Sequence, residues 1–474
     1  MDSKFKSDIQ QLLQYTNTTQ IDKALDLIAT YAENIPSDKL DCLRLAQLSL
    51  ELGGMSYSVK ILKKLSDKEP EDLKLKYHLA TAYLFCNDYE NAKQIFELNK
   101  GKFDSNAGAL NTVASCYSGL GEFDEAERLF RKALELNPTL GIAAHGLSKC
   151  RKFEKDDYPL LEQLEKAKPN AKDNDSLIKL NKAIAKIYND LKEYDKAWEA
   201  AKEANDLFNS LSPFPGLDIP AKRLEVVEKY KEKFNTSTSE EEHLLIVGMP
   251  RSGTTLTEQI ISSHPSYQQS GESPSLEFSI QYGLHNSIFE NSINASVEQL
   301  NKAAEGYSFY YSQLGAAKGK RIINKVPANY MNIGFFKQMF SKGKVIFLQR
   351  DYRDVTASIF FEHFSSPQSF TNKVDDIIAT YKFALSAIEK WKQVFADDIY
   401  ILKYEDLVND KEQCLHNISE FLGIKKDDIL GNENNKSAVN TPSLWQVRQG
   451  VYKTSKSRYL RYSALKDLPE LNES

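Results

Sequence analysis

The sequence lacks long apolar runs and any strong excess of charge. No run approaches the ~20 apolar residues that a membrane-spanning helix needs, and residues 1–20 lack the apolar core of a signal peptide. A net charge of −5 over 474 residues gives no reason to expect a nucleic acid or an anionic membrane as partner. We therefore expect two or three domains in a chain that remains in the cytoplasm.

Cysteine is scarce, and its spacing argues against both a disulfide framework and a metal site. The five cysteines are odd in number, scattered, and never arranged as C-x-x-C. We expect free thiols on buried helix faces in a reducing compartment. They are Cys42, Cys86, Cys116, Cys150 and Cys414.

What the first half contains is a repeat with a period of 34 residues. Small and aromatic residues of the segment 77–96 recur in the segment 111–130, for example Ala80 as Ala114 and Tyr83 as Tyr117. Two weaker copies lie at 46–62 and 185–197, and residues 143–170 leave room for a degenerate one.

This period resembles that of tetratricopeptide (TPR) repeats, in which each unit is a pair of helices. One unit cannot bury its own apolar face, so the units stack into a solenoid with a concave face. That face either binds a peptide or protein partner, or the solenoid is a structural extension; the pattern leaves both open. Prolines and a glycine in residues 209–218 end the helical pattern. We predict a TPR domain over residues 1–235 and a second domain over residues 243–474.

The second half alternates short apolar segments with helical patterns. The segments HLLIVGM, RIINK, KVIFLQR and IYILKY are typical of buried strands. We expect helices over Thr255–Ser263, Asp354–Phe364, Asp375–Phe395 and Lys411–Leu422. This alternation predicts an α/β domain with a parallel sheet covered on both faces, whose ligands bind beyond the carboxyl ends of the strands.

The first of these strands leads into GMPRSGTT, which nearly fits the phosphate-binding pattern G-x-x-x-x-G-K-[ST]. Gly248 and Gly253 let the backbone approach an anion, and N–H groups from Ser252 to Thr255 are expected to point at it from a helix N-terminus. Thr254 stands where the lysine would be. The loop therefore predicts phosphate binding without triphosphate hydrolysis.

A second group of residues follows the strand KVIFLQR. Arg350 ends the strand, Asp354 is expected to cap the next helix, and Ser358 lies one turn further on the same face. Arg350 and Ser358 can converge on a second anion. Residues 318–353 hold nine basic residues and one acidic residue, which we interpret as support for one ligand with two anionic ends.

With these motifs, the second half resembles the sulfotransferases that use 3′-phosphoadenosine 5′-phosphosulfate (PAPS), and within them the TPR-containing and tyrosylprotein enzymes. The resemblance covers about residues 243–465. It is carried by PRSGTTL, SHP, GE, NKVP, RDYRDVTAS, KYEDLV and WQVRQGVY in this order. It implies a P-loop-like sulfotransferase domain that needs no metal and releases 3′-phosphoadenosine 5′-phosphate (PAP).

The resemblance also implies roles for single residues. Glu272 matches the catalytic base, and Lys325 matches the lysine that stabilises charge developing on the bridging oxygen. Arg350 and Ser358 match the residues that bind the 3′-phosphate, and Tyr404 lies near the nucleotide. The loop residues that match the 5′-phosphosulfate site are Arg251, Ser252, Gly253, Thr254 and Thr255, and Arg251 is counted with the catalytic residues too.

The remaining candidates lie on the acceptor side and near the C-terminus. His363 is an alternative base, and His264 is expected to cap a helix end. Relatives carry Gly-Arg-Trp near the end where this chain has SKSRYLRY, so Lys456 and Arg458 are expected to reach a phosphate instead. Trp445 and its neighbours Gln446 and Arg448 are candidates for shaping the acceptor site.

Three functions remain open at this point. The first is transfer of a sulfuryl group to a hydroxyl of a peptide (a protein tyrosine above all), a glycan or a small molecule. The second is a nucleotide kinase or NTPase, which would require lysine at position 254 and a magnesium-binding aspartate. The third is a TPR adaptor with an inactive transferase domain, against which Glu272 and Lys325 argue.

Overall fold

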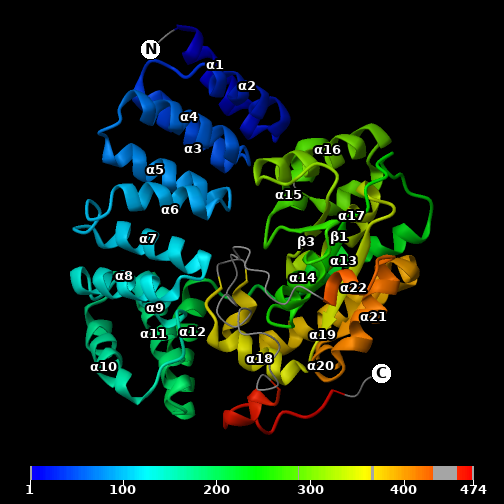
Figure 1. Ribbon diagram of the computed structural model, residues 1–474. Helices are drawn as coiled ribbons and strands as arrows, with labels where there is room; N and C mark the ends of the chain where they lie inside the picture. Colours follow the sequence, from blue (N-terminus) through cyan, green and yellow to red (C-terminus); the bar gives the residue numbers. More distant parts are fainter. Residues whose placement is uncertain (1–2, 287, 365–367, 431–455, 472–474) are drawn as a thin grey trace.

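The computed structural model describes residues 3–286, 288–364, 368–430 and 456–471. It consists of an all-helical first half and an α/β second half that lie side by side (Figure 1). The fold class predicted from the sequence is therefore confirmed. No helix of these residues has both the length and the apolar character to cross a membrane.

The first half is a stack of helix pairs along one side of the molecule (Figure 1). The predicted repeats are the pairs α3–α4, α5–α6, α7–α8 and α11–α12, and the degenerate repeat is α9–α10. The pair α1–α2 precedes them and lies outside the predicted repeats. The bounds are α1 (Ser3–Asn17), α2 (Ile21–Glu33), α3 (Lys39–Glu51), α4 (Met55–Lys68), α5 (Leu73–Phe85), α6 (Tyr89–Leu98), α7 (Ala107–Leu120), α8 (Phe123–Leu136), α9 (Gly141–Ser148), α10 (Tyr158–Ala167), α11 (Asn174–Asp190) and α12 (Tyr194–Leu211).

Small residues of the repeat let neighbouring helices approach closely. Ala114 is fully buried, and a Cβ atom at position 119, which is glycine, would lie 2.2 Å from the ring of Tyr89. Polar residues define several helix starts, since the side chains of Asp72 and Asn106 accept backbone N–H groups of α5 and α7. The repeat therefore specifies both the contacts between helices and the points at which they begin.

The second half is built on one parallel sheet of five strands in the order β2-β3-β1-β4-β5. The strands are β1 (Leu244–Gly248), β2 (Tyr267–Gln269), β3 (Arg321–Asn324), β4 (Lys344–Gln349) and β5 (Ile399–Lys403). All but β2 coincide with predicted strands. The helices are α13 (Asp218–Leu224), α14 (Thr254–Ser262), α15 (Ser275–Leu284), α16 (Val297–Gln313), α17 (Ile333–Met339), α18 (Tyr352–Phe361), α19 (Val374–Phe395), α20 (Tyr404–Asn409), α21 (Lys411–Leu422) and α22 (Asp427–Leu430).

Both faces of this sheet are buried, as expected for parallel strands. On β1, Leu244 and Ile246 belong to one hydrophobic cluster with residues of α14 and α21. Leu245 and Val247 belong to the other, larger cluster, which includes residues of α16, α17 and α19. Because the strands are parallel, their carboxyl ends lie along one edge, and the segments that follow them are brought together there.

The solenoid contacts the second half at both of its ends. Near the N-terminus, Lys302 Nζ of α16 lies 2.8 Å from Asp22 Oδ2 of α2. Near the last repeat, the ring of Trp198 on α12 stacks on Phe360 of α18 with centroids 4.2 Å apart. Lys182 Nζ of α11 donates to the carbonyl oxygen of Phe360 at 2.8 Å. The last repeat therefore packs against the helix that follows β4.

We expect Lys182 to make the stability of the protein depend on pH. Its Nζ is buried and also donates to Asn205 Oδ1 at 2.6 Å. Burial lowers the pKa of Lys182 to about 7, from 10.5. Between these values the unfolded chain binds a proton that the folded chain has released, so a rise in pH favours the folded state.

Lys182→Met removes this titration at similar side-chain length. In urea denaturation, the free energy of unfolding of wild type should rise by about 1–2 kcal/mol relative to that of the variant between pH 7 and pH 9. Lys202→Met is the matched control, because Lys202 lies on α12 with 53% of its side chain exposed. A difference between wild type and Lys182→Met that stays constant with pH would contradict this expectation.

Candidate active site

The loop between β1 and α14 lies at the carboxyl edge of the sheet. Gly253 is the N-cap residue of α14 with φ +110°, and the N–H of Thr257 is bonded to its carbonyl oxygen at 3.1 Å. The N–H groups of Thr254–Leu256 precede that bond and have no acceptor within the helix. A helix end of this kind attracts an anion.

One part of the predicted loop geometry is wrong. The Ser252 N–H lies 3.3 Å from the carbonyl oxygen of Met249 and the Ser252 hydroxyl 2.7 Å from it, and both donate to it. The N–H groups available to an anion therefore start at Gly253 rather than at Ser252. Ser252, Thr254 and Thr255 are all buried, so this loop is a packed part of the domain.

Two arginines and a serine converge beside this loop. Arg251 Nε donates to Ser358 Oγ at 3.0 Å, and Arg350 Nη1 donates to the carbonyl oxygen of Arg251 at 3.0 Å. The guanidinium carbon of Arg350 lies 4.5 Å from the centre of the Tyr404 ring. The structure thus brings the residues predicted for the two anionic ends into one connected group.

The predicted helix cap after β4 is a different aspartate. The side chain of Asp351, not that of Asp354, accepts the N–H group at the start of α18. Asp354 instead accepts the N–H groups of Ser457 and Tyr459 at 2.8 and 3.2 Å. Asp354 therefore attaches the C-terminal segment to α18, and the nearer Asp351 is the cap because its side chain reaches the first turn.

The two C-terminal candidates, Lys456 and Arg458, contact α20 and α18. Lys456 Nζ donates to Asn409 Oδ1 at the end of α20. Arg458 Nε donates to the Tyr462 hydroxyl at 3.3 Å, and its guanidinium lies over the ring of Phe361. The motif WQVRQGVY, with Trp445, Gln446 and Arg448, lies outside the described residues.

Glu272 and Lys325 form an ion pair at the ends of β2 and β3. Lys325 Nζ lies 2.9 Å from Glu272 Oε1. The lysine side chain is fully buried, whereas 38% of the glutamate side chain is exposed. Glu272 can therefore meet a substrate from solvent, while Lys325 approaches from the protein interior.

A second carboxylate lies beside Lys325 and was not among the candidates from the sequence. Glu258 of α14 is buried, and its Oε2 lies 4.0 Å from Lys325 Nζ. Burial raises the pKa of Glu258. A signal was present, because Glu258 lies three residues before Ile261 and so shares a helix face with an apolar residue.

A third ion pair connects the site to the solenoid. Lys149 Nζ, just past α9, lies 2.7 Å from Glu362 Oε1 at the end of α18, and His145 Nε2 lies 3.6 Å from the same oxygen. Burial would raise the pKa of Glu362, but Lys149, His145 and Arg251 together hold it well below its usual range. Periodicity within the repeats gave no sign of this contact.

The two histidines considered from the sequence lie elsewhere. Burial lowers the pKa of His363 to about 4, and its ring contacts are with His145 and Phe208 of the solenoid. His264 Nδ1 accepts the N–H of Ser266 at 3.1 Å, just past the end of α14. In the part of the chain that the structure describes, neither histidine ring contacts Glu272 or Lys325.

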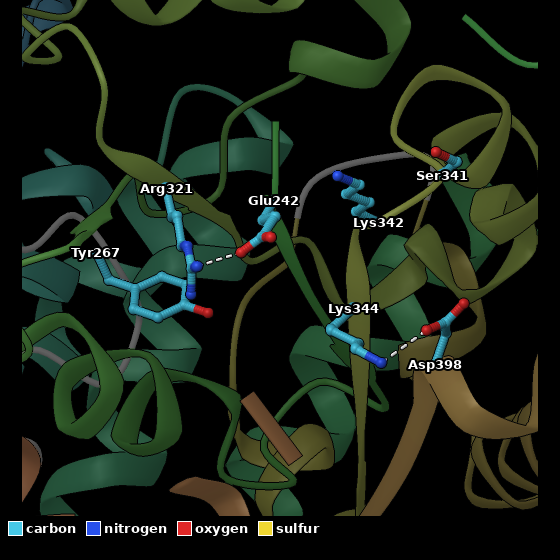
Figure 2. Close-up of a pocket in the computed structure, with 7 residues that line it drawn as sticks. All are labelled: Glu242, Tyr267, Arg321, Ser341, Lys342, Lys344 and Asp398. Atoms are coloured by element: carbon cyan, nitrogen blue, oxygen red, sulfur yellow. Dashed lines mark hydrogen bonds and ion pairs between the residues drawn. The ribbon is translucent and has the colours of Figure 1, made fainter. Parts of the chain in front are cut away.

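The basic stretch 318–353 does not gather at one ligand, contrary to our interpretation of the sequence. Several of its cations surround a cavity of about 360 Å³ at the amino ends of the strands, opposite the candidate site (Figure 2). They are paired there: Arg321 with Glu242, and Lys344 with Asp398. Their role is to neutralise carboxylates at that edge.

Comparison with known proteins identifies both halves. Residues 243–428 match the model of the sulfotransferase family. The matched segment is a sulfotransferase-family domain. Residues 73–98 and 107–140 match models of the tetratricopeptide repeat.

Several proteins are similar to this chain. An uncharacterized protein of Aquifex aeolicus is 27% identical over 448 residues, 88% of this chain and 57% of that protein. A protein-tyrosine sulfotransferase of Drosophila melanogaster is 22% identical over 215 residues, 43% of each. The sulfotransferase domain of the Synechococcus PCC 7002 olefin synthase is 17% identical with a TM-score of 0.36, covering 51% of this chain and 94% of that domain. The chain spans about half the length of the curated relatives it matches.

Within the sulfotransferase domain, the loop conformation predicts a large penalty for a side chain at position 253. A Cβ atom there would lie 2.6 Å from the Tyr404 ring, on a backbone with φ +110°. At Gly423, φ is +63° and a Cβ atom would meet nothing within 4 Å. We expect Gly423→Ala to cost about 1 kcal/mol and Gly253→Ala to cost about 3 kcal/mol or more. Equal shifts of their thermal midpoints would show that the close approach to Tyr404 does not matter.

Proposed function

We propose that the chain transfers a sulfuryl group from PAPS to an acceptor hydroxyl and releases PAP. The observation that carries this proposal is the arrangement along the carboxyl edge of the sheet. The anion loop and its two arginines follow β1 and β4, and the ion pair of Glu272 with Lys325 follows β2 and β3. The match of this segment to the sulfotransferase family supports the same chemistry.

The residues present fit a nucleotide with an anion at each end. The donors around the loop are N–H groups, hydroxyls and guanidinium groups, and the ring of Tyr404 lies directly against Gly253. In the proposal, Arg251 and the loop Gly253–Thr255 hold the 5′ end, while Ser252 shapes the loop through its bonds to Met249. Arg350 with Ser358 holds the 3′-phosphate. Tyr404 lies beside the nucleotide. Lys456 and Arg458 are proposed to approach it from the C-terminal segment.

When bound, PAPS supplies a sulfuryl group on a phosphate leaving group. Glu272 accepts the proton of the acceptor hydroxyl, for which its partly exposed carboxylate is suited. Lys325 stabilises the negative charge that develops on the leaving oxygen. Its ammonium group has three donors, so it can keep one hydrogen bond to Glu272 while it binds a second oxygen.

The acceptor and the setting belong to the same proposal. A peptide tyrosine is favoured by the likeness to protein-tyrosine sulfotransferases, and a TPR domain over residues 1–235 suits the presentation of a polypeptide to the domain over 243–474. Glycan or small-molecule hydroxyls are the alternative acceptors.

We propose the cytoplasm as compartment, because all five cysteines are free. A kinase or an inactive adaptor is disfavoured by Thr254 and by the Glu272–Lys325 pair.

Calorimetry with nucleotides tests the donor site. PAP should bind in the micromolar range or tighter without metal, whereas ATP with Mg²⁺ should bind weakly. Arg350→Ala should weaken PAP binding by about 30-fold to 100-fold, because a charge-assisted contact is lost. Lys342→Ala, at the opposite edge of the sheet, should leave the affinity unchanged. Strong ATP binding with no binding of PAP would refute the proposal.

Labelled-sulfate transfer from PAPS to a panel of peptides and glycans tests the chemistry. Glu272→Gln keeps the shape of the side chain but removes the base, so kcat should fall by roughly 10²-fold to 10⁴-fold. PAP affinity should remain within a few-fold of wild type, which separates a lost base from a damaged donor site. If the variant transferred sulfate as fast as wild type, Glu272 would not be the base.

A further inference from the structure

Glu258 connects three parts of the candidate site, and the inference from it deepens the function proposed above. It lies on α14, the helix that starts at the anion loop. Its two carboxylate oxygens point to different partners. One holds the loop that carries Glu272, and the other faces Lys325.

The first oxygen holds the backbone directly before Glu272. Glu258 Oε1 accepts the N–H of Ser270 at 3.1 Å and that of Gly271 at 2.9 Å. Gly271 has φ +66°, a left-handed conformation that turns the chain sharply. A buried carboxylate that accepts two N–H groups of such a turn fixes where the next side chain begins.

The second oxygen compensates the charge of Lys325. Glu258 Oε2 lies 4.0 Å from Lys325 Nζ, and Glu272 Oε1 lies 2.9 Å from it. Lys325 has no exposed surface, so its ammonium requires a negative partner inside the protein. When Lys325 also binds a reacting oxygen, Glu258 still faces it, because the bonds from the Ser270 and Gly271 N–H groups hold the Glu258 carboxylate in place.

We propose that Glu258 is a positioning residue: it fixes the turn that presents Glu272 and remains the counter-charge of Lys325 while Lys325 serves the reaction. It does not touch the acceptor. The titratable groups that face it are Lys325 from the end of β3 and Glu272 from the loop after β2. The phenol of Tyr311 on α16 bonds the hydroxyl of Ser270 at 3.2 Å and completes the surroundings.

Hydrogen exchange of the loop tests the first role without any need for activity. Glu258→Ala removes the oxygen that accepts both N–H groups and should accelerate exchange of the Ser270 and Gly271 amides at least tenfold. Glu258→Gln keeps a carbonyl oxygen and should leave them protected. Glu277→Gln is the matched control, a partly buried glutamate on α15 that lacks contacts to these amides among the described residues. Unchanged exchange in Glu258→Ala would overturn this role.

The pH dependence of kcat/KM tests the second role. Glu258→Gln keeps the shape of the side chain but removes a negative charge 4.0 Å from Lys325 Nζ, and the loss of a nearby negative charge favours the deprotonated form of the groups that control the rate. Both limbs of the profile should therefore move to lower pH by about one unit, while the affinity for PAP stays within threefold. A merely structural role would lower the rate at every pH without moving the limbs, and that result would overturn the proposal.

The experiments distinguish a failure of the proposed function from a failure of the role proposed for Glu258. If wild-type protein transfers no sulfate and binds no PAP, the proposed function fails, although the exchange experiment still decides whether Glu258 holds the turn. If wild-type protein is active but Glu258→Gln has an unshifted profile, the function stands and the charge role of Glu258 is wrong.

Discussion

The buried charge of Lys325 is the constraint on which the candidate site depends. An ammonium group with no exposed surface is stabilised where carboxylates lie beside it. Two carboxylates do so here, and they come from different elements and differ in exposure. The exposed one can meet a substrate, and the buried one lies beside the lysine as a second negative partner. The two carboxylates thus have different roles, which explains why this edge of the sheet carries more acidic groups than the proposed chemistry uses.

The solenoid is also part of this electrostatic arrangement. Its last repeats place Lys149 against Glu362 and Lys182 against the carbonyl oxygen of Phe360, at the end of α18. That helix begins next to Arg350 and carries Ser358. A change in the packing of the last repeats would therefore alter the position of α18, which carries the candidate 3′-phosphate residue Ser358. Its N-terminal helices contact α15 and α16 instead, so the solenoid is held at both ends.

Much of the fold could be predicted because its signals are local. Four strands were predicted correctly since strands buried on both faces are continuous apolar runs, and the repeats were found by their period. The strand β2 escaped because it has only three residues at the edge of the sheet. The helices α15–α17 were not predicted, although α16 buries Leu300, Ala304 and Tyr307 at helical spacing. Contacts such as Glu258 with Gly271 could not be predicted, because they depend on how separate elements meet.

The same limit applies to the anion site, where two motifs about one hundred residues apart form a single structure. Arg251 adopts a left-handed conformation with φ +69°, which costs about 1–2 kcal/mol for a residue with a side chain. Its carbonyl oxygen accepts from Arg350 and its guanidinium donates to Ser358, so two residues that follow β4 hold it at two points. Strain of this kind persists where the surrounding groups hold the residue, as these two contacts do. The PRSGTT loop is thus shaped by the strand beside it as much as by its own glycines, which is why neither motif alone could reveal the geometry of the site.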